Sequence, residues 1–196
     1  MLGSMTGYEE SLIRRSQAGD LESFNLLVER YQTQVYNLAL RMLGNHHDAE
    51  DTTQETFVSA WKSIPNFHGN NFRAWLLRIA ANACIDLLRT RKGKRVDPID
   101  VVFPEFNPLT SEAESPEDHV LREELAQLLS QKLLELPPEQ RLVVTLADLQ
   151  GLSYEEISQI LGCSLGTVKS RLSRGRAHLR CLLLAHPELL PPEFRL

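Results

Sequence analysis

The chain of 196 residues has few cysteines, few glycines and prolines, and no long apolar run. Its three cysteines (Cys84, Cys163 and Cys181) are odd in number and form no Cys-x-x-Cys pair, which argues against a disulfide scaffold or a multi-cysteine zinc site. Ten glycines and ten prolines are too few for a fibrous or low-complexity chain. No apolar run approaches the ~18 residues of a membrane span, and no signal-peptide core follows the start. These absences predict a reduced, cytoplasmic protein with no membrane insertion of its own.

Charge is unevenly distributed, although the formal net charge is only −5. Residues 96–124 contain nine acidic residues and one basic residue, a net charge of −8, while the segments on either side are close to neutral. Four prolines interrupt this acidic segment: Pro98, Pro104, Pro108 and Pro116. Acidic, proline-containing segments without apolar periodicity cannot build a core, so we expect a flexible acidic linker over residues 96–120.

The segments that flank this linker have helical periodicity. Apolar residues recur at three- and four-residue steps in three stretches before it, residues 24–42, 57–64 and 72–87, and again after it. No stretch alternates with a period of two for long enough to form a strand. We therefore expect an all-α protein with an N-terminal helical bundle over residues 10–95. A second small helical domain is expected over residues 121–182, followed by a C-terminal tail over residues 183–196.

A short helix, a tight turn and a basic helix follow one another in the second domain. Ser153 and Glu156 form a capping box at the start of the first helix. Gly162 favours a tight turn, and Ser164 is a natural N-cap for the second helix. This succession predicts a helix-turn-helix, whose second helix fits the major groove of DNA.

The second helix carries basic and hydroxyl side chains on the faces that its apolar stripe leaves open. Arginine and lysine neutralise phosphates and read guanine edges, while serine and threonine reach either kind of target. A solvated basic helix is the simpler interpretation, but it leaves the turn and the two caps unexplained. The expected DNA contacts are Ser164, Thr167, Lys169, Ser170, Arg171, Arg174 and Arg176.

The sequence GLSYEEI over residues 151–157, followed by GxSxGTVKSRLxR over residues 162–174, resembles the fourth conserved region of bacterial sigma factors. The extracytoplasmic-function group is the most similar. This resemblance implies that the second helix reads the minus-thirty-five promoter element and that the β flap of RNA polymerase is a partner. Response regulators contain a similar helix-turn-helix, so this motif alone leaves open a DNA-binding transcriptional regulator that is not a sigma subunit.

The sequence DAEDTTQETFxxAW over residues 48–61 resembles the second conserved sigma region, which docks on a coiled coil of the polymerase β′ subunit. On a helix, Asp51, Gln54 and Glu55 lie three to four residues apart and share one face. Such an acidic and amide face suits a basic coiled coil. The resemblance implies core RNA polymerase as a partner, with docking contacts at Asp48, Asp51, Gln54 and Glu55.

The segment over residues 67–89 resembles the promoter-melting part of the same region. In that family a loop and a helix hold the non-template strand of the minus-ten element with one base turned out of the stack, at a cost that a shaped pocket and stacking offset. The aromatic residues here are expected to be mostly core. The DNA contacts that the resemblance implies are His68, Asn70, Asn71, Arg78, Asn82, Asp86 and Arg89.

Signals for catalysis and metal binding are weak. The sequence HHDxED over residues 46–51 suggests a metal site, but no Glu-x-x-His or His-Glu-x-x-His pair accompanies it. No Walker-type loop and no Gly-x-Ser-x-Gly motif is present. We expect no catalytic residue, no metal and no cofactor.

The chain is identified as a member of the extracytoplasmic-function sigma family. This resemblance implies an alternative sigma factor that binds core RNA polymerase, reads the minus-thirty-five element and melts the minus-ten element of promoter DNA. It also implies an anti-sigma protein as a further partner. A helix-turn-helix regulator that is not a sigma subunit and a helical metalloenzyme are the alternatives.

Overall fold

The computed structural model describes residues 3–69, 71–91 and 116–186, and all regular elements within these ranges are helical. The expected all-α class is confirmed. In chain order the elements are α1 (Gly3–Gln17), α2 (Leu21–Leu43), α3 (His46–Ser63), η1 (Ile64–Asn66), α4 (Phe72–Arg91), α5 (Pro116–Glu135), α6 (Pro138–Val144), η2 (Thr145–Leu149), α7 (Tyr154–Leu161) and α8 (Leu165–Leu183). None of these helices is long and apolar enough to cross a membrane.

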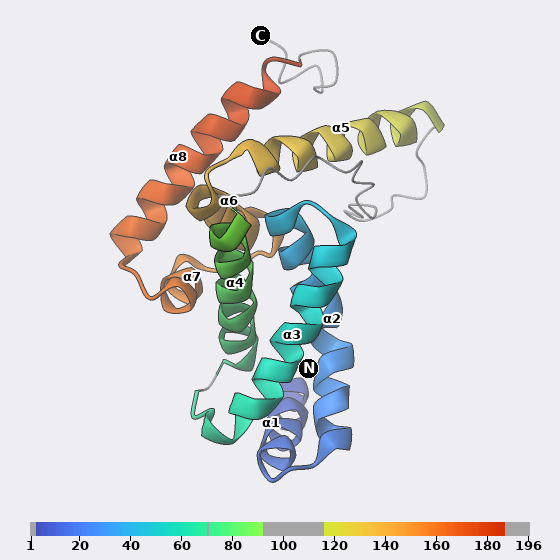
Figure 1. Cartoon of the computed structure of the whole chain (residues 1–196), viewed down its shortest axis with the longest axis vertical. Coiled ribbons are helices and arrows are strands. Elements are labelled where there is room, and N and C mark those ends of the chain that lie inside the picture. The colour runs from blue at the N-terminus through green and yellow to red at the C-terminus, as the bar shows by residue number, and fades with distance from the viewer. Residues whose placement is uncertain (1–2, 70, 92–115, 187–196) are drawn as a thin grey trace.

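Helices α1 to α4 form the N-terminal half, a bundle in which α2, α3 and α4 lie alongside one another (Figure 1). Polar caps define where these helices begin. The carboxylate of Asp20 accepts a hydrogen bond from the backbone N–H of Glu22 at 3.1 Å, and the side chain of Asn45 accepts from that of Asp48 at 2.8 Å. Each cap satisfies a backbone donor that the first helical turn leaves without a partner.

Helices α5 to α8 form the C-terminal half, in which α8 packs across α6 (Figure 1). The two helices approach closely at Gly175, which is buried. A Cβ atom at Gly175 would lie 2.8 Å from Cγ2 of Val144 and 3.3 Å from the backbone oxygen of Gln140. A side chain at this crossing would therefore require Val144 or its neighbours on α6 to shift.

The first residue of α5 falls inside the segment that was expected to be a linker. Pro116 begins this helix rather than breaking it. Proline is favoured at the first helical position because the N–H that it lacks would have no intrahelical partner there. The linker expectation over residues 96–115 and the part of the tail expectation beyond residue 186 lie outside the described residues.

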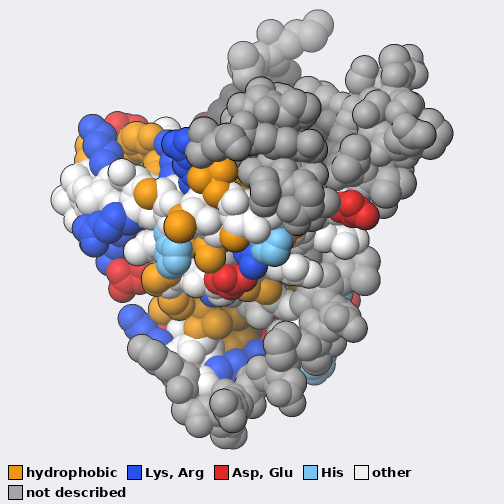
Figure 2. All heavy atoms as spheres, turned by 90° about the horizontal axis from the view of Figure 1, so that it is seen from above, with side chains coloured by type: hydrophobic (Ala, Val, Ile, Leu, Met, Phe, Trp, Pro, Cys, Tyr) orange, Lys and Arg blue, Asp and Glu red, His pale blue; other side chains and the backbone are white. Residues whose placement is uncertain are grey.

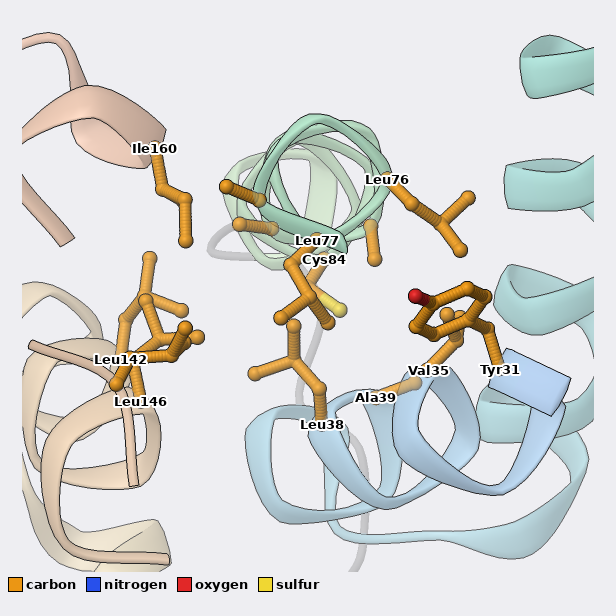
Figure 3. Packing of buried hydrophobic residues seen from close by; sticks show 14 of the residues in the cluster. Tyr31, Val35, Leu38, Ala39, Leu76, Leu77, Cys84, Leu142, Leu146 and Ile160 are labelled. Atoms are coloured by element: carbon orange, nitrogen blue, oxygen red, sulfur yellow. The ribbon is translucent and has the colours of Figure 1, made fainter. Parts of the chain in front are cut away.

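One hydrophobic core runs through both halves. Figure 3 shows Leu142, Leu146 and Ile160 on one side of α4, and side chains of α2 such as Val35 and Leu38 on the other. All five are 3% exposed or less. The face of α4 turned toward the C-terminal half is therefore covered by protein in this arrangement.

Candidate nucleic-acid and partner interfaces

An acidic and amide face lies on the outside of α3. Asp51, Gln54 and Glu55 are all exposed, on successive turns of the helix. His47 lies 3.6 Å from the Asp51 carboxylate, and both side chains remain largely open to solvent. The opposite side of α3 carries buried Phe57 and Ala60. These three polar side chains are available to a partner that approaches from outside the bundle.

Asp48 does not share this exposed face. Its side chain is buried and contacts the guanidinium group of Arg91, at the end of α4. The side-chain amide of Asn45 donates to the same carboxylate. The structure thus brings together three of the four side chains expected for docking and places the fourth in the packing between α3 and α4.

An apolar groove between α2 and α3, with a volume of about 680 Å³, adjoins the acidic and amide face. Its lining includes Gln54 together with Leu21, Phe57, Val58 and Trp61. Leu21 and Val58 are 55% and 46% exposed, which is unusual for large apolar side chains. Sequence analysis missed this groove. The sequence indicates the groove only in that Leu21 and Val58 lie outside the apolar stripes of their helices.

Three of the expected minus-ten residues line a hollow between the first half of α4 and α7. His68, Asn71 and Arg78 border this hollow, which has a volume of about 650 Å³, and Glu155 and Glu156 of α7 face them. His68 and Arg78 are exposed. Two carboxylates thus stand beside side chains that are expected to meet a nucleic-acid strand.

Three more expected minus-ten residues line a second hollow, of about 440 Å³, further along α4. Asn82, Asp86 and Arg89 border it, and they face Glu139 of α6 and Arg171 of α8. The side chains of Asp86 and Arg89 also pair with each other at 3.3 Å on the exposed surface. Both predicted DNA-reading helices, α4 and α8, therefore turn side chains toward the same hollow.

Asn71 has a structural role that sequence analysis missed. Its side-chain oxygen accepts a hydrogen bond from the backbone N–H of Ala74 at 2.9 Å, so Asn71 is the N-cap of α4. Its amide donates to Oε1 of Glu156 at 3.0 Å. The Asn-x-x-Ala sequence before an apolar helix was the available signal. Asn70, also expected to contact DNA, lies outside the described residues.

Aromatic side chains support this part of α4. Phe67, Phe72 and Trp75 form a cluster with ring centroids 5.0 to 5.7 Å apart. Phe67 and Phe72 are buried, whereas Trp75 is half-buried and lines the first hollow. The cluster holds the start of α4 against the loop before it.

The helix-turn-helix is formed by α7, a turn at residues 162–164 and α8. The capping box of Ser153 and Glu156 is present, and Gly162 takes the left-handed conformation, with φ of +59°, that ends α7. Ser164 caps α8 by accepting from the backbone N–H of Thr167 at 3.2 Å. Each of these features confirms a local prediction from the sequence.

Basic side chains gather along the side of the molecule where α8 lies (Figure 2). Lys169 and Arg174 are exposed, and Ser170 and Thr167 are half-buried. Two of the expected DNA contacts are engaged within the chain: Arg171 pairs with Glu139 at 2.6 Å, and Arg176 donates to Asp148 at 3.0 Å.

The ion pair with Asp148 changes the electrostatics of Arg176. The side-chain hydrogen bond from Arg176 to that carboxylate raises the pKa of the guanidinium group, which stays fully charged. Any DNA phosphate that Arg176 meets must therefore compete with the carboxylate of Asp148 for this charge.

Hydrogen bonds join the two halves across the core. The guanidinium of Arg73, on α4, donates to the side chain of Gln34 at 3.1 Å and to the backbone oxygen of Gln150 at 2.7 Å. Gln150 in turn donates to the backbone oxygen of Gln34 at 3.0 Å. Buried Arg141 of α6 donates to the backbone oxygen of Met42 at the end of α2.

No group of three or more potential metal ligands occurs among the residues that the structure describes. Of the three thiols, Cys84 is buried, Cys163 is half-buried and Cys181 is exposed. Burial raises the pKa of the Cys84 thiol to about 12, so this group stays protonated and unreactive at neutral pH.

Two segments of the chain match known protein families. Residues 27–94 match the family model of sigma-70 region 2, and residues 126–179 match that of sigma-70 region 4. The first match contains α3 and α4, and the second contains the helix-turn-helix. Together they define the class of protein as a sigma factor of the sigma-70 type, a DNA-binding regulator of transcription.

Similar proteins show which group of sigma factors the chain resembles. The chain is 41% identical to the ECF RNA polymerase sigma factor SigE of Mycolicibacterium smegmatis, over 85% of this chain and 63% of that protein. It is 39% identical to the ECF RNA polymerase sigma factor SigW of Bacillus subtilis, over 86% of this chain and 92% of that protein. The sigma factor RpoE of Bartonella quintana, solved in complex with the anti-sigma factor NepR, superimposes with a TM-score of 0.66 at 27% identity and covers 83% of this chain and 97% of that one.

The chain belongs to the extracytoplasmic-function family of RNA polymerase sigma factors. It is thus an alternative sigma factor, which directs transcription initiation.

Proposed function

We propose that this sigma factor binds core RNA polymerase through α3, reads the minus-thirty-five element with α8 and holds the melted minus-ten element on α4. The β′ coiled coil would meet the exposed face of Asp51, Gln54 and Glu55, and the β flap would meet the C-terminal half. The observation that carries this proposal is the presence, on one chain, of this face and of a capped helix-turn-helix. A promoter-specificity subunit needs both surfaces, whereas a regulator that is not a sigma subunit needs only the second.

The proposed division of the chain follows the expected domains. Residues 10–95 would dock on core polymerase and melt the minus-ten element, and residues 121–182 would read the minus-thirty-five element. Residues 96–120 would tether the two, with the first turn of α5 at the end of this tether. A tether lets the two DNA-reading helices adjust to the spacing of the promoter elements.

The proposed function requires the two halves to separate. Glu155 and Glu156 of α7 face the minus-ten side chains of α4, and Glu139 faces both Arg171 and the second hollow. These carboxylates repel DNA phosphates. A promoter strand can therefore reach α4 only after α6 and α7 have moved away, and the free energy of core binding is the source that we propose for this opening.

The chain itself would supply no catalytic group, since phosphodiester chemistry belongs to the polymerase. Transcription by that polymerase would place this factor in the cytoplasm. An anti-sigma factor is a proposed further partner, because the similar RpoE of Bartonella quintana is found in complex with NepR. Such a partner would compete with polymerase for the chain.

The experiment is a titration of a labelled promoter fragment, at physiological salt, with the factor alone and with the factor bound to core polymerase. The proposal predicts specific binding only in the presence of core, because carboxylates of α6 and α7 face the expected minus-ten side chains of α4 in the isolated factor. A promoter with a scrambled minus-ten element is the control. Tight, sequence-specific binding by the isolated factor, unchanged by core, would instead favour the regulator alternative.

A further inference from the structure

The last two turns of α4 are less deeply buried than the rest of the helix, although they carry expected promoter contacts. The last fully buried side chain of this helix is Cys84. Every residue from 85 to 91 is half-buried or exposed, and this segment includes Asp86 and Arg89. Ile85 and Leu88 pack against the core as partly buried side chains, so side-chain packing holds these turns less firmly than the part of α4 up to Cys84.

An ion pair between half-buried Arg91 and buried Asp48 fastens this segment at its end. Both terminal nitrogens of Arg91 donate to the two carboxylate oxygens of Asp48, in the first turn of α3. Asp48 is 7% exposed, and the backbone N–H of Asp48 is itself fixed by Asn45 at 2.8 Å. A two-pronged contact of this kind sets the orientation as well as the distance of its partners.

The charges of the pair also suit the two helix ends. Asp48 lies at the N-terminal end of α3, where the helix dipole favours a negative charge, and Arg91 lies at the C-terminal end of α4, where it favours a positive one. A buried charge is costly unless it is paired. Each partner therefore stabilises the charge of the other, and the ion pair fixes the C-terminal end of α4 relative to the N-terminal end of α3.

We infer that Asp48 and Arg91 are positioning residues: their ion pair fixes the C-terminal turns of α4 relative to α3, so that Asp86 and Arg89 meet promoter DNA at a defined distance from the docked polymerase. Asp48 then acts through Arg91 and does not touch polymerase. This inference rests on the proposed function, since it assigns a role within the proposed docking and melting surfaces.

The test separates docking from melting in holoenzyme reconstituted with full-length factor. Asp48→Asn removes the negative charge and keeps the size, and Arg91→Gln removes the guanidinium from the other helix. Affinity for core is measured by fluorescence titration, and melting by permanganate reactivity of minus-ten thymines at saturating core. Glu10→Gln is the matched control, because Glu10 is an exposed carboxylate that pairs with Arg14 on α1.

Each variant should bind core within about twofold of wild type and lose about three- to thirty-fold in melting, the range of couplings carried through packed elements. The double variant should lose no more than either single one, because the two residues act as one unit. Arg91→Lys keeps the positive charge but lacks the two guanidinium nitrogens that contact Asp48, so it should recover part of the lost melting. If Asp48→Asn does not fold, as judged by circular dichroism, Arg91→Gln alone carries the test.

Two results would overturn the inference. Weakened core binding by Asp48→Asn with normal binding by Arg91→Gln would mean that Asp48 contacts polymerase directly. Unchanged melting by both variants would mean that the pair only stabilises the fold. A wild-type factor that neither binds core nor melts a promoter would refute the proposed function itself, which is a different outcome.

Discussion

The side-chain amide of Asn71 donates a hydrogen bond of 3.0 Å to Oε1 of Glu156. The two residues belong to opposite halves of the chain. Asn71 caps the helix that is expected to hold the minus-ten element, and Glu156 completes the capping box of Ser153 at the start of α7. One contact thus joins the two parts of the chain that are proposed to read DNA. It also occupies a side chain that promoter DNA is expected to need.

Weakening the contact between the halves should open the isolated factor. Arg73→Ala removes hydrogen bonds to Gln34 and to the backbone of Gln150, and we expect a larger radius of gyration by small-angle scattering. The cost should be about 1–3 kcal/mol of interface stability, because the half-buried partner groups lose their donor. Arg14→Ala, which alters an exposed pair on α1, is the control. A scattering curve of Arg73→Ala that superimposes on wild type would argue against this contact as a link between the halves.

Reversing the charges on the outer face of α3 should weaken docking. The double variant Asp51→Arg, Glu55→Arg places positive charge against a basic coiled coil, which should cost about 2 kcal/mol or more of core affinity. Both residues are exposed, so helicity by circular dichroism should be unchanged. Glu10→Arg, on α1, is the matched control. Normal affinity of the double variant for core, measured by fluorescence titration, would remove these residues from the docking surface.

Residues of α8 should divide between base reading and phosphate contact. Lys169 and Arg171 lie in the first two turns, whereas Arg180 lies in the last turn. Lys169→Ala or Arg171→Ala should cost about 1–3 kcal/mol and relax the preference at one base pair. Arg180→Ala should weaken binding to all upstream sequences alike. It should also reduce, by about one, the magnitude of the slope of log binding constant against log salt concentration. Transcription from a panel of promoters with altered minus-thirty-five elements measures both effects. If Lys169→Ala and Arg171→Ala reduce transcription equally from every promoter, these two residues contact phosphates.

The carboxylate of Asp48 should make the stability of the fold depend on pH. Its hydrogen bond from Arg91 lowers its pKa below the ordinary value of 3.8. A carboxylate whose native pKa is lowered stabilises the fold above its unfolded pKa, and this stability is lost as pH falls through the native value. We therefore expect Asp48→Asn to cost about 1–3 kcal/mol at neutral pH.

This cost should stay constant above about pH 5 and shrink below pH 3.8, where unfolded Asp48 becomes protonated. Urea unfolding followed by circular dichroism at a series of pH values measures the difference between wild type and variant. A difference that does not change between neutral and acidic pH would show that the charge of Asp48 contributes nothing to the fold.

Local signals in the sequence predicted local structure well. The limits of α7 and α8 follow from the capping box of Ser153, the left-handed Gly162 and the N-cap Ser164, all of which act within a few residues. Helix α5 begins at Pro116, inside the expected linker, and a proline in an acidic segment indicates a break as readily as a helix start. The π-helical turn η2, closed by the backbone bond from Gln150 to Thr145, has no local signal.

Long-range contacts account for what the sequence did not predict in the candidate site. Asp48 has the residue type and spacing of a docking residue, yet its partner Arg91 lies 43 positions away and draws it into the interior. The pairing of Arg171 with Glu139 likewise depends on the packing of α8 across α6. Side-chain spacing on a single helix cannot reveal a partner on another one.

Run-off transcription by purified core polymerase, from a promoter in the genome that encodes this factor, shows whether the chain acts as a sigma subunit. We expect specific transcripts only when the factor is added, and we expect the double variant Asp51→Arg, Glu55→Arg to abolish them. We also expect their loss when either the minus-thirty-five or the minus-ten element is scrambled. Transcription that is independent of the added factor, or a factor that only represses transcription started by another sigma subunit, would contradict this expectation.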